Sequence, residues 1–156
     1  MTGQTSLIVH GTCIARASRA ALITGPSGSG KSDLALRFLD RFADAHLVAD
    51  DQVALRRAGD GLLASSPGHL AGLLEVRGLG LVRRRHAPAR LCLMVELASP
   101  GADLARLAEP DWQQFLDIEV PTIPLAGFEA SAPLRLALAL ETIGARGFPG
   151  EDGLLR

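Results

Sequence analysis

The segment that most constrains the fold lies at residues 25–32 and reads GPSGSGKS. It matches the pattern G-x-x-x-x-G-K-[ST] at every fixed position. The apolar run RAALITG (19–25) leads into it, and KSDLALRFLDRF (31–42) follows with helical apolar spacing. A glycine-rich loop between a buried strand and a helix is the setting in which this motif binds phosphate groups. The sequence therefore predicts an α/β domain with a nucleotide-binding P-loop, also called a Walker A motif.

Each residue type in the motif suits that task. Gly25, Gly28 and Gly30 let the backbone turn so that several N–H groups point at one anion. Lys31 is the only lysine among 16 basic residues, and its compact ammonium fits beside β- and γ-phosphates better than a planar guanidinium. Ser32 offers a hydroxyl to Mg²⁺. The predicted ATP-binding set is Gly25, Pro26, Ser27, Gly28, Ser29, Gly30, Lys31 and Ser32.

The loop alone does not define the reaction. A plain alternative is a glycine-rich turn that only caps a helix. If the loop does bind phosphate, it fits ATPases, GTPases, kinases and transporters alike. The chain has no N-K-x-D sequence, and that guanine-reading motif would be expected in a GTPase.

Composition argues against several other classes of function. The 156-residue chain has a net charge of −1, five Phe, one Trp and no Tyr, so nucleic-acid binding is not expected. No apolar run is long enough to span a membrane, and residues 1–11 do not have the pattern of a signal peptide. Cys13 and Cys92 have no metal-type spacing and are expected to be free, buried thiols. A cytoplasmic protein is the expectation.

Apolar patterning predicts a single domain over residues 1–156, with a mixed sheet and more strands than helices. Strands are expected at 6–11, at 12–15 as its continuation or partner, at 19–25, at both ends of 45–57 and at 89–98. A hairpin turn is expected at 58–61. Residues 72–82 fit a strand or a loop, and 118–125, with two prolines, fits an edge strand or an extended loop. Helices are expected at 31–42 and 132–147.

A second group of residues carries the functional groups that phosphoryl transfer needs. His10 ends the first expected strand, Asp50 and Asp51 follow an apolar strand, and Glu75 and Arg77 stand beside two glycines. Phosphoryl transfer needs a metal ligand, a group that positions or deprotonates the nucleophile, and positive charge on the transferred oxygens. Each residue alone has a simpler explanation, as a satisfied histidine, a turn or an exposed ion pair.

The order of these motifs resembles a known family. His-Gly, the P-loop, L-V-A-D-D and then E-V-R-G-L-G follow one another as in bacterial HPr kinase/phosphorylase. The resemblance covers almost the whole chain and corresponds to the family's C-terminal catalytic domain, as in its short form. It implies a nucleotide-binding fold similar to phosphoenolpyruvate carboxykinase. It also implies a Mg–ATP-dependent kinase that phosphorylates a serine of the phosphocarrier protein HPr within a regulatory phosphotransferase system.

The resemblance also implies roles for individual residues. Ser32 and Glu75 would hold Mg²⁺. One aspartate of the Asp50–Asp51 pair would be the general base, and His10 would support it. The segment from Leu74 to Arg83 is similar to the family's second signature, which includes Arg77, and Arg106 is similar in position to an active-site arginine. The implied assembly is a homo-oligomer, a hexamer in the family.

Two departures from the family pattern qualify these expectations. The family's reverse reaction, phosphorolysis of phosphoserine, uses a proline-rich loop with arginines, whereas the corresponding IPLAGFE (123–129) has none. Phosphorylase activity is therefore in doubt. The sequence ends soon after Arg146, so a shortened C-terminal helix and an altered hexamer are expected.

Two other functions stay open: a non-catalytic ATP-sensing module and a small-molecule kinase. The aspartate pair favours catalysis, because a sensor needs no base near the γ-phosphate. The run Arg83-Arg84-Arg85 before His86 forms a basic patch that is either a protein-docking surface or a solvated strand end.

Overall fold

The structure is a computed structural model that describes residues 5–107 and 109–156. Its elements follow in the order β1 Ser6–His10, β2 Thr12–Arg16, β3 Arg19–Thr24, α1 Lys31–Arg41, β4 Ala45–Ala49, β5 Gln52–Ala58, β6 Gly61–Ser65, the 3₁₀ helix η1 Gly68–Leu70, β7 Leu73–Val76, β8 Gly80–Arg83, β9 Ala89–Leu97, β10 Trp112–Phe115, β11 Ile118–Leu125, α2 Ala132–Glu141 and α3 Ile143–Arg146. Strands outnumber helices, as predicted, and the long helices follow the glycine-rich loop and the last strand.

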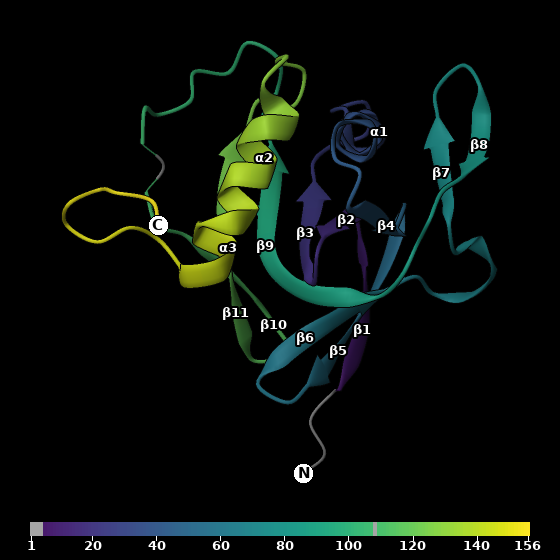
Figure 1. Ribbon diagram of the computed structural model, residues 1–156, viewed down its shortest axis with the longest axis horizontal. Coiled ribbons are helices and arrows are strands. Elements are labelled where there is room, and N and C mark those ends of the chain that lie inside the picture. Colours follow the sequence, from purple (N-terminus) through teal and green to yellow (C-terminus); the bar gives the residue numbers. More distant parts are fainter. Residues whose placement is uncertain (1–4, 108) are drawn as a thin grey trace.

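The main sheet is mixed and has the order β1-β5-β6-β9-β3-β2-β4, with β11 also paired to β9 and β10 paired to β11. Strands β3 and β11 run parallel to β9, and the other pairs are antiparallel. The β7–β8 hairpin is a separate two-stranded sheet that stands beside α1, apart from the main sheet (Figure 1). The predicted α/β class with a mixed sheet is confirmed.

The sheet has a hydrophobic cluster on each face. One cluster lies under the helices, where Phe38 of α1 and Leu136 of α2 are fully buried against the central strands. The other fills the opposite face, where β1, β5 and β6 curl over the sheet and Leu55 meets Leu22 and its neighbours. Burial on both faces explains the continuous apolar runs of β3 and β9. The central strands are therefore a rigid base for the loops at their ends.

Helix α1 begins directly at the glycine-rich loop. Its N-cap, Gly30, has φ 96°, a left-handed conformation that favours glycine. Leu34, Ala35 and Phe38 form the buried face, and Asp33 in the first turn complements the positive end of the helix dipole. The sequence thus fixes both the start of the helix and the face that it buries.

Four sequence-based expectations need refinement. Residues 12–16 form a strand that neither continues nor pairs with β1, because β2 pairs with β3 and β4. Residues 72–82 are a hairpin rather than one strand or a loop. Strand β11 is not a simple edge strand, since β10 pairs with its first half and β9 with its second. The single helix expected at 132–147 is interrupted at Thr142, whose hydroxyl donates to the Leu138 carbonyl (2.7 Å).

Both cysteines are free: Cys13 is buried and Cys92 is partly buried, so the expectation of two buried thiols holds fully only for Cys13. Burial raises the pKa of both thiols above the usual value. Within the described residues, no helix is long and apolar enough to cross a membrane.

Candidate active site

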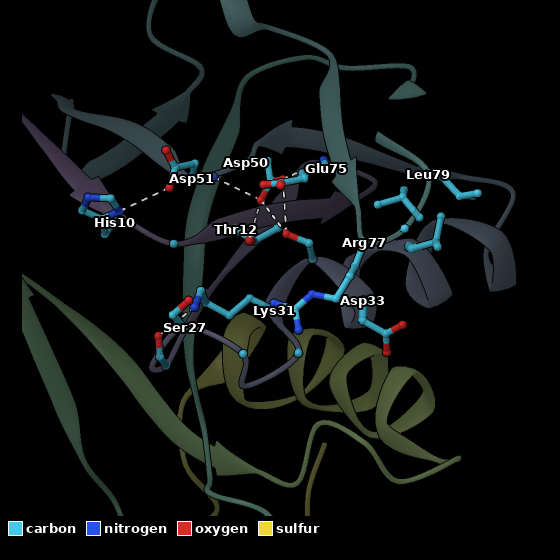
Figure 2. Close-up of a pocket in the computed structure, with 18 of the residues that line it drawn as sticks. His10, Thr12, Ser27, Lys31, Asp33, Asp50, Asp51, Glu75, Arg77 and Leu79 are labelled. Carbon is cyan, nitrogen blue, oxygen red and sulfur yellow. Dashed lines mark hydrogen bonds and ion pairs between the residues drawn. The ribbon is translucent and has the colours of Figure 1, made fainter. Parts of the chain in front are cut away.

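A pocket of about 870 Å³ lies at the end of the sheet where β1, β3 and β4 finish and β2 begins. Its walls come from the β1–β2 turn, the glycine-rich loop, the start of α1, the β4–β5 turn and the tip of the β7–β8 hairpin. Most of the residues proposed from the sequence line it, namely His10, Gly25, Ser27, Gly28, Gly30, Lys31, Ser32, Asp50, Asp51, Glu75 and Arg77. Segments far apart in the sequence therefore meet at one place (Figure 2).

Asp50 is the most firmly held side chain of the pocket. Its carboxylate accepts hydrogen bonds from the hydroxyls of Thr12 (2.8 Å) and Ser32 (3.0 Å). The backbone N–H groups of Asp51 (3.1 Å) and Glu75 (3.0 Å) also donate to it. Four donors from four segments fix the orientation of this carboxylate. Asp50 thus links the glycine-rich loop, the sheet and the hairpin.

Asp51 faces a different partner. Its carboxylate lies 3.5 Å from Nδ1 of His10, and both side chains are largely exposed, Asp51 at 72% and His10 at 83% (Figure 2). The residue has φ 70°, which is uncommon for a non-glycine residue and is found at turns and functional sites. Its carbonyl accepts from the Gly11 N–H (3.1 Å). Two adjacent aspartates are therefore turned toward two different parts of the pocket.

Gly11 makes this arrangement possible. It lies between β1 and β2, and a Cβ at this position would come within 2.7 Å of the Ile23 carbonyl oxygen. Only glycine lets the turn approach β3 so closely. The β1–β2 turn is thereby held against the β4–β5 turn, and the His10 side chain is brought to Asp51.

The Lys31 side chain lies along its own loop. Its ammonium donates to the carbonyls of Gly25 (2.8 Å) and Pro26 (3.0 Å). Ser29 is buried behind the loop, and its hydroxyl has no hydrogen-bond partner among the described residues. Ser29 and Pro26 do not line the pocket, in contrast to the other members of the motif. They support the loop from outside the cavity.

The two arginines proposed for the site differ in position. Arg77 lies at the tip of the β7–β8 hairpin and lines the pocket (Figure 2). Arg106 is exposed in the connection between β9 and β10 and does not line the pocket. The residues around Arg106 form no specific motif. The sequence therefore did not predict that Arg106 lies in the β9–β10 connection, outside the pocket.

The basic run at 83–85 is not uniform. Arg83 is exposed at the end of β8, and Arg84 donates to its carbonyl. Arg85 instead donates to the carbonyls of Ala43 (3.1 Å) and Ala45 (2.9 Å), so it supports the turn before β4. Arg85 is a structural residue, and only Arg83 and Arg84 remain as candidates for a docking patch.

The sequence assigned no role to three residues that are important to the site: Gly11, which was named only as part of the His-Gly motif, Thr12 and Phe128. Thr12 directly follows the His-Gly pair, so its place in the motif was visible although its bond to Asp50 was not. Phe128 lies about 100 residues from the loop that it contacts, and only the fold brings the two together.

The donor set fits a magnesium ion bound together with phosphate. A serine hydroxyl has one proton and two lone pairs, so Ser32 can donate to Asp50 and still offer a lone pair to a cation. Glu75 adds a carboxylate on the pocket wall. Within the described residues, no three His, Cys, Asp or Glu side chains gather into a metal-binding cluster. Magnesium in phosphate sites commonly takes only one or two carboxylates and completes its shell with phosphate and water.

The fold and the site define the class of the protein. It is an α/β domain with a mixed, curled sheet, in which a glycine-rich loop faces a pair of carboxylates across a pocket. The model of the HPr serine kinase C-terminal domain family matches residues 3–126. The chain belongs to this family.

Individual relatives agree with this assignment. The HPr kinase/phosphorylase of Geobacillus thermodenitrificans is 37% identical over 131 residues, covering 75% of this chain and 42% of the relative. That of Clostridium botulinum is 40% identical over 74 residues, covering 47% and 24%. The chain thus spans less than half the length of these curated relatives. The structure of the Hpr(Ser) kinase/phosphatase from Coxiella burnetii has the same fold, with a TM-score of 0.72 and 23% identity, covering 86% of this chain and 88% of that one.

Proposed function

We propose that this domain is a Mg–ATP-dependent protein kinase that transfers the γ-phosphoryl group to a serine of an HPr-like phosphocarrier protein. The observation that carries the proposal is the division of work between the adjacent aspartates. Asp50 is bonded to Ser32 of the phosphate-binding loop, whereas Asp51 faces His10 near the pocket mouth. Phosphoryl transfer needs groups that hold the metal and the phosphates and a separate carboxylate at the nucleophile; Asp50 would orient the metal-binding Ser32, and Asp51 would be the carboxylate at the nucleophile.

The loop and the helix after it would bind the β- and γ-phosphates. The first N–H groups of α1 have no partners within the helix and carry the positive end of its dipole. Lys31 would exchange the carbonyls of Gly25 and Pro26 for phosphate oxygens. Arg77, which enters from the opposite wall, would offset charge on the transferred group.

Asp51 is the better candidate for the base. Four donors already occupy the Asp50 carboxylate, whereas the only side chain within ion-pair distance of the Asp51 carboxylate, among the described residues, is His10. In the proposed step the serine oxygen bonds to the γ-phosphorus and the bond to the bridging oxygen of ADP breaks. The serine proton passes to Asp51, and His10 orients that carboxylate.

Ser32 and Glu75 are the proposed magnesium ligands, with Asp50 orienting the Ser32 hydroxyl. When bound, the ion would neutralise charge on the β- and γ-phosphate oxygens. The chain's own part in this step is to hold the hydroxyl and to present the Glu75 carboxylate at the hairpin.

The exposure of the proposed base favours a protein substrate over a small metabolite. Asp51 and His10 lie near the surface, where a serine on another protein can reach them. The hairpin beside the pocket exposes Leu79 and Leu81, at 83% and 62%, and contiguous exposed apolar residues are typical of protein contacts. A metabolite kinase would instead be expected to enclose its acceptor.

Phosphorolysis of phosphoserine is proposed to be weak. The turn that follows β11 brings Phe128, not an arginine, to the pocket. An attacking inorganic phosphate would lack a cation from this side.

The test is incubation with γ-labelled ATP, Mg²⁺ and purified HPr from the same organism. Label on an HPr serine, lost in Asp51→Asn but with ATP binding retained, is the expected result. Nucleotide binding without transfer to any acceptor would favour the ATP-sensing alternative. Transfer to a metabolite instead of HPr would favour a small-molecule kinase.

A further inference from the structure

An aromatic side chain stands at the edge of the phosphate-binding loop without a task in the proposed reaction. Phe128 lines the pocket and is 55% exposed, although most phenylalanines are buried in protein cores. A Cβ on Gly30 would come within 2.8 Å of Phe128 Cε1 and 2.9 Å of Cζ. The ring therefore packs against the loop where it becomes helix α1. Because the loop covers the ring on one side only and the residue stays 55% exposed, the ring can still stack with another planar group.

The backbone around Phe128 is fixed. The Arg37 guanidinium, on α1, donates to the carbonyl of Gly127 and to that of Glu129 (3.2 Å). Arg37 is itself held by Asp33 (2.9 Å). The Glu129 carbonyl also accepts from the first N–H of α2 (3.0 Å). The ring is thus presented from a turn clamped between two helices, so its position costs little to maintain when a ligand binds.

The pocket offers few alternatives for a planar ring. Its other large apolar lining residues are Leu36, Val76 and Leu79, and Phe128 is the only aromatic one among the described residues. The carboxylates and Ser32 fix the end of the pocket where phosphate reacts. The base of a nucleotide has to leave the loop away from that end. Phe128 contacts the loop at Gly30, whereas the Ser32 hydroxyl is turned toward Asp50.

We propose that Phe128 is the platform on which the nucleobase of the bound nucleotide stacks. The inference rests on the proposed nucleotide-dependent function and adds the residue that recognises the base. Stacking on an aromatic face tolerates any base, so the platform supplies affinity for nucleotides over inorganic polyphosphates rather than selectivity for adenine. Arg37 is its positioning residue.

The test compares two ligands that share the phosphates and differ in the base. Titration calorimetry with Mg²⁺ measures the Kd of ATP and of inorganic triphosphate for the wild type, Phe128→Ala and Phe128→Tyr. We expect Phe128→Ala to weaken ATP roughly 10-fold or more and to leave triphosphate within about twofold, since only the base is lost. Phe128→Tyr keeps the ring and should keep ATP affinity. Leu79→Ala, on the opposite wall, is the matched control and should affect neither ligand.

Each of the other outcomes refutes base stacking on Phe128 and points to a specific alternative. Equal weakening of both ligands by Phe128→Ala would mean that the ring only supports Gly30. An unchanged ATP affinity, or a loss of ATP affinity in Leu79→Ala instead, would place the base elsewhere. A wild-type protein that binds triphosphate as tightly as ATP would refute the platform alone. A wild-type protein that binds neither would refute the proposed function as well.

A spectroscopic readout separates stacking from a general effect on the loop. In Phe128→Trp, a base stacked on the indole should quench its fluorescence, whereas triphosphate should not. The wild type, which carries Trp112 on β10 away from the pocket, gives the background signal. Equal quenching by both ligands would contradict stacking.

Discussion

The clearest test of the site is to neutralise its two adjacent aspartates one at a time. Asp50→Asn places an amide N–H₂ where four donors converge on two carboxylate oxygens. At least one of these donors then faces the amide N–H₂, which cannot accept a hydrogen bond. The remaining donors bond to a neutral amide oxygen instead of a charged carboxylate. Asp51→Asn keeps the shape of an exposed side chain whose one ion-pair contact, among the described residues, is His10 at 3.5 Å. The same unit of charge is removed in both variants, so general electrostatic effects are matched.

The expected losses of stability differ. Two hydrogen bonds lost or weakened at a half-buried carboxylate cost roughly 2–4 kcal/mol in Asp50→Asn. In a domain of this size that lowers Tm by between about 5 and 15 °C. An exposed contact such as that of Asp51 contributes at most about 1 kcal/mol, so Asp51→Asn should lower Tm by only a few degrees. The variant that loses less stability is still expected to lose transfer. Asp51→Asn removes the proposed general base, and such a loss typically lowers the rate about 10²–10⁴-fold.

The assay pairs thermal unfolding with single-turnover transfer from ATP to HPr and with ATP binding by calorimetry. Asp51→Asn should fold and bind ATP like the wild type and fail in transfer. Asp50→Asn should be less stable and bind Mg–ATP weakly. The reasoning is refuted if Asp51→Asn transfers at the wild-type rate, or if the two variants lose equal stability.

Three further substitutions test the remaining parts of the site. Lys31→Arg should nearly abolish transfer although the charge is kept, as measured by turnover; wild-type turnover would contradict the phosphate role of the loop. Glu75→Gln should weaken ATP binding with Mg²⁺ more than without it, and an equal loss under both conditions would argue against a metal ligand. Arg83→Ser with Arg84→Ser should raise the KM for HPr at low salt and leave the Kd for ATP unchanged, because exposed charges act mainly on encounter. An unchanged KM would exclude the patch, and Arg85 is left in place because it supports a turn.

Much of the fold could be predicted because local patterns and tertiary structure agree. The helix after the loop has both a strong apolar face and a glycine at its N-cap, and the buried strands are continuous apolar runs. The errors occurred where long-range pairing decides the outcome. Strand β11 pairs with two partners, one along each half. Strand β10 is short and mostly exposed, so it has no apolar alternation that would predict a strand. The last helix is interrupted at Thr142, where φ is −105° and ψ is −76°, and helix propensity does not reveal this break.

The candidate site could be predicted as a set of residues but not as a geometry. Motif order placed His10, the loop, the aspartates and the hairpin together, and the pocket joins them. The sequence could not assign different partners to Asp50 and Asp51, because that difference arises from the left-handed turn at Asp51 and the bonds of its neighbour. Arg106 was placed by resemblance alone, and the described pocket does not include it.

The Asp50 and Lys31 sides of the pocket differ in how many hydrogen bonds would have to break when a nucleotide binds. This difference predicts which step of the proposed reaction carries the free-energy cost of rearrangement. Asp50 is already held by four donors, so its orientation would need no rearrangement during the proposed reaction. In the proposed function Lys31 would have to give up the carbonyls of Gly25 and Pro26 before it could contact a phosphate. The cost would therefore fall on nucleotide binding rather than on the chemical step. Any contact that holds the nucleotide away from the reacting end, as proposed for Phe128, would offset that cost without altering the carboxylates.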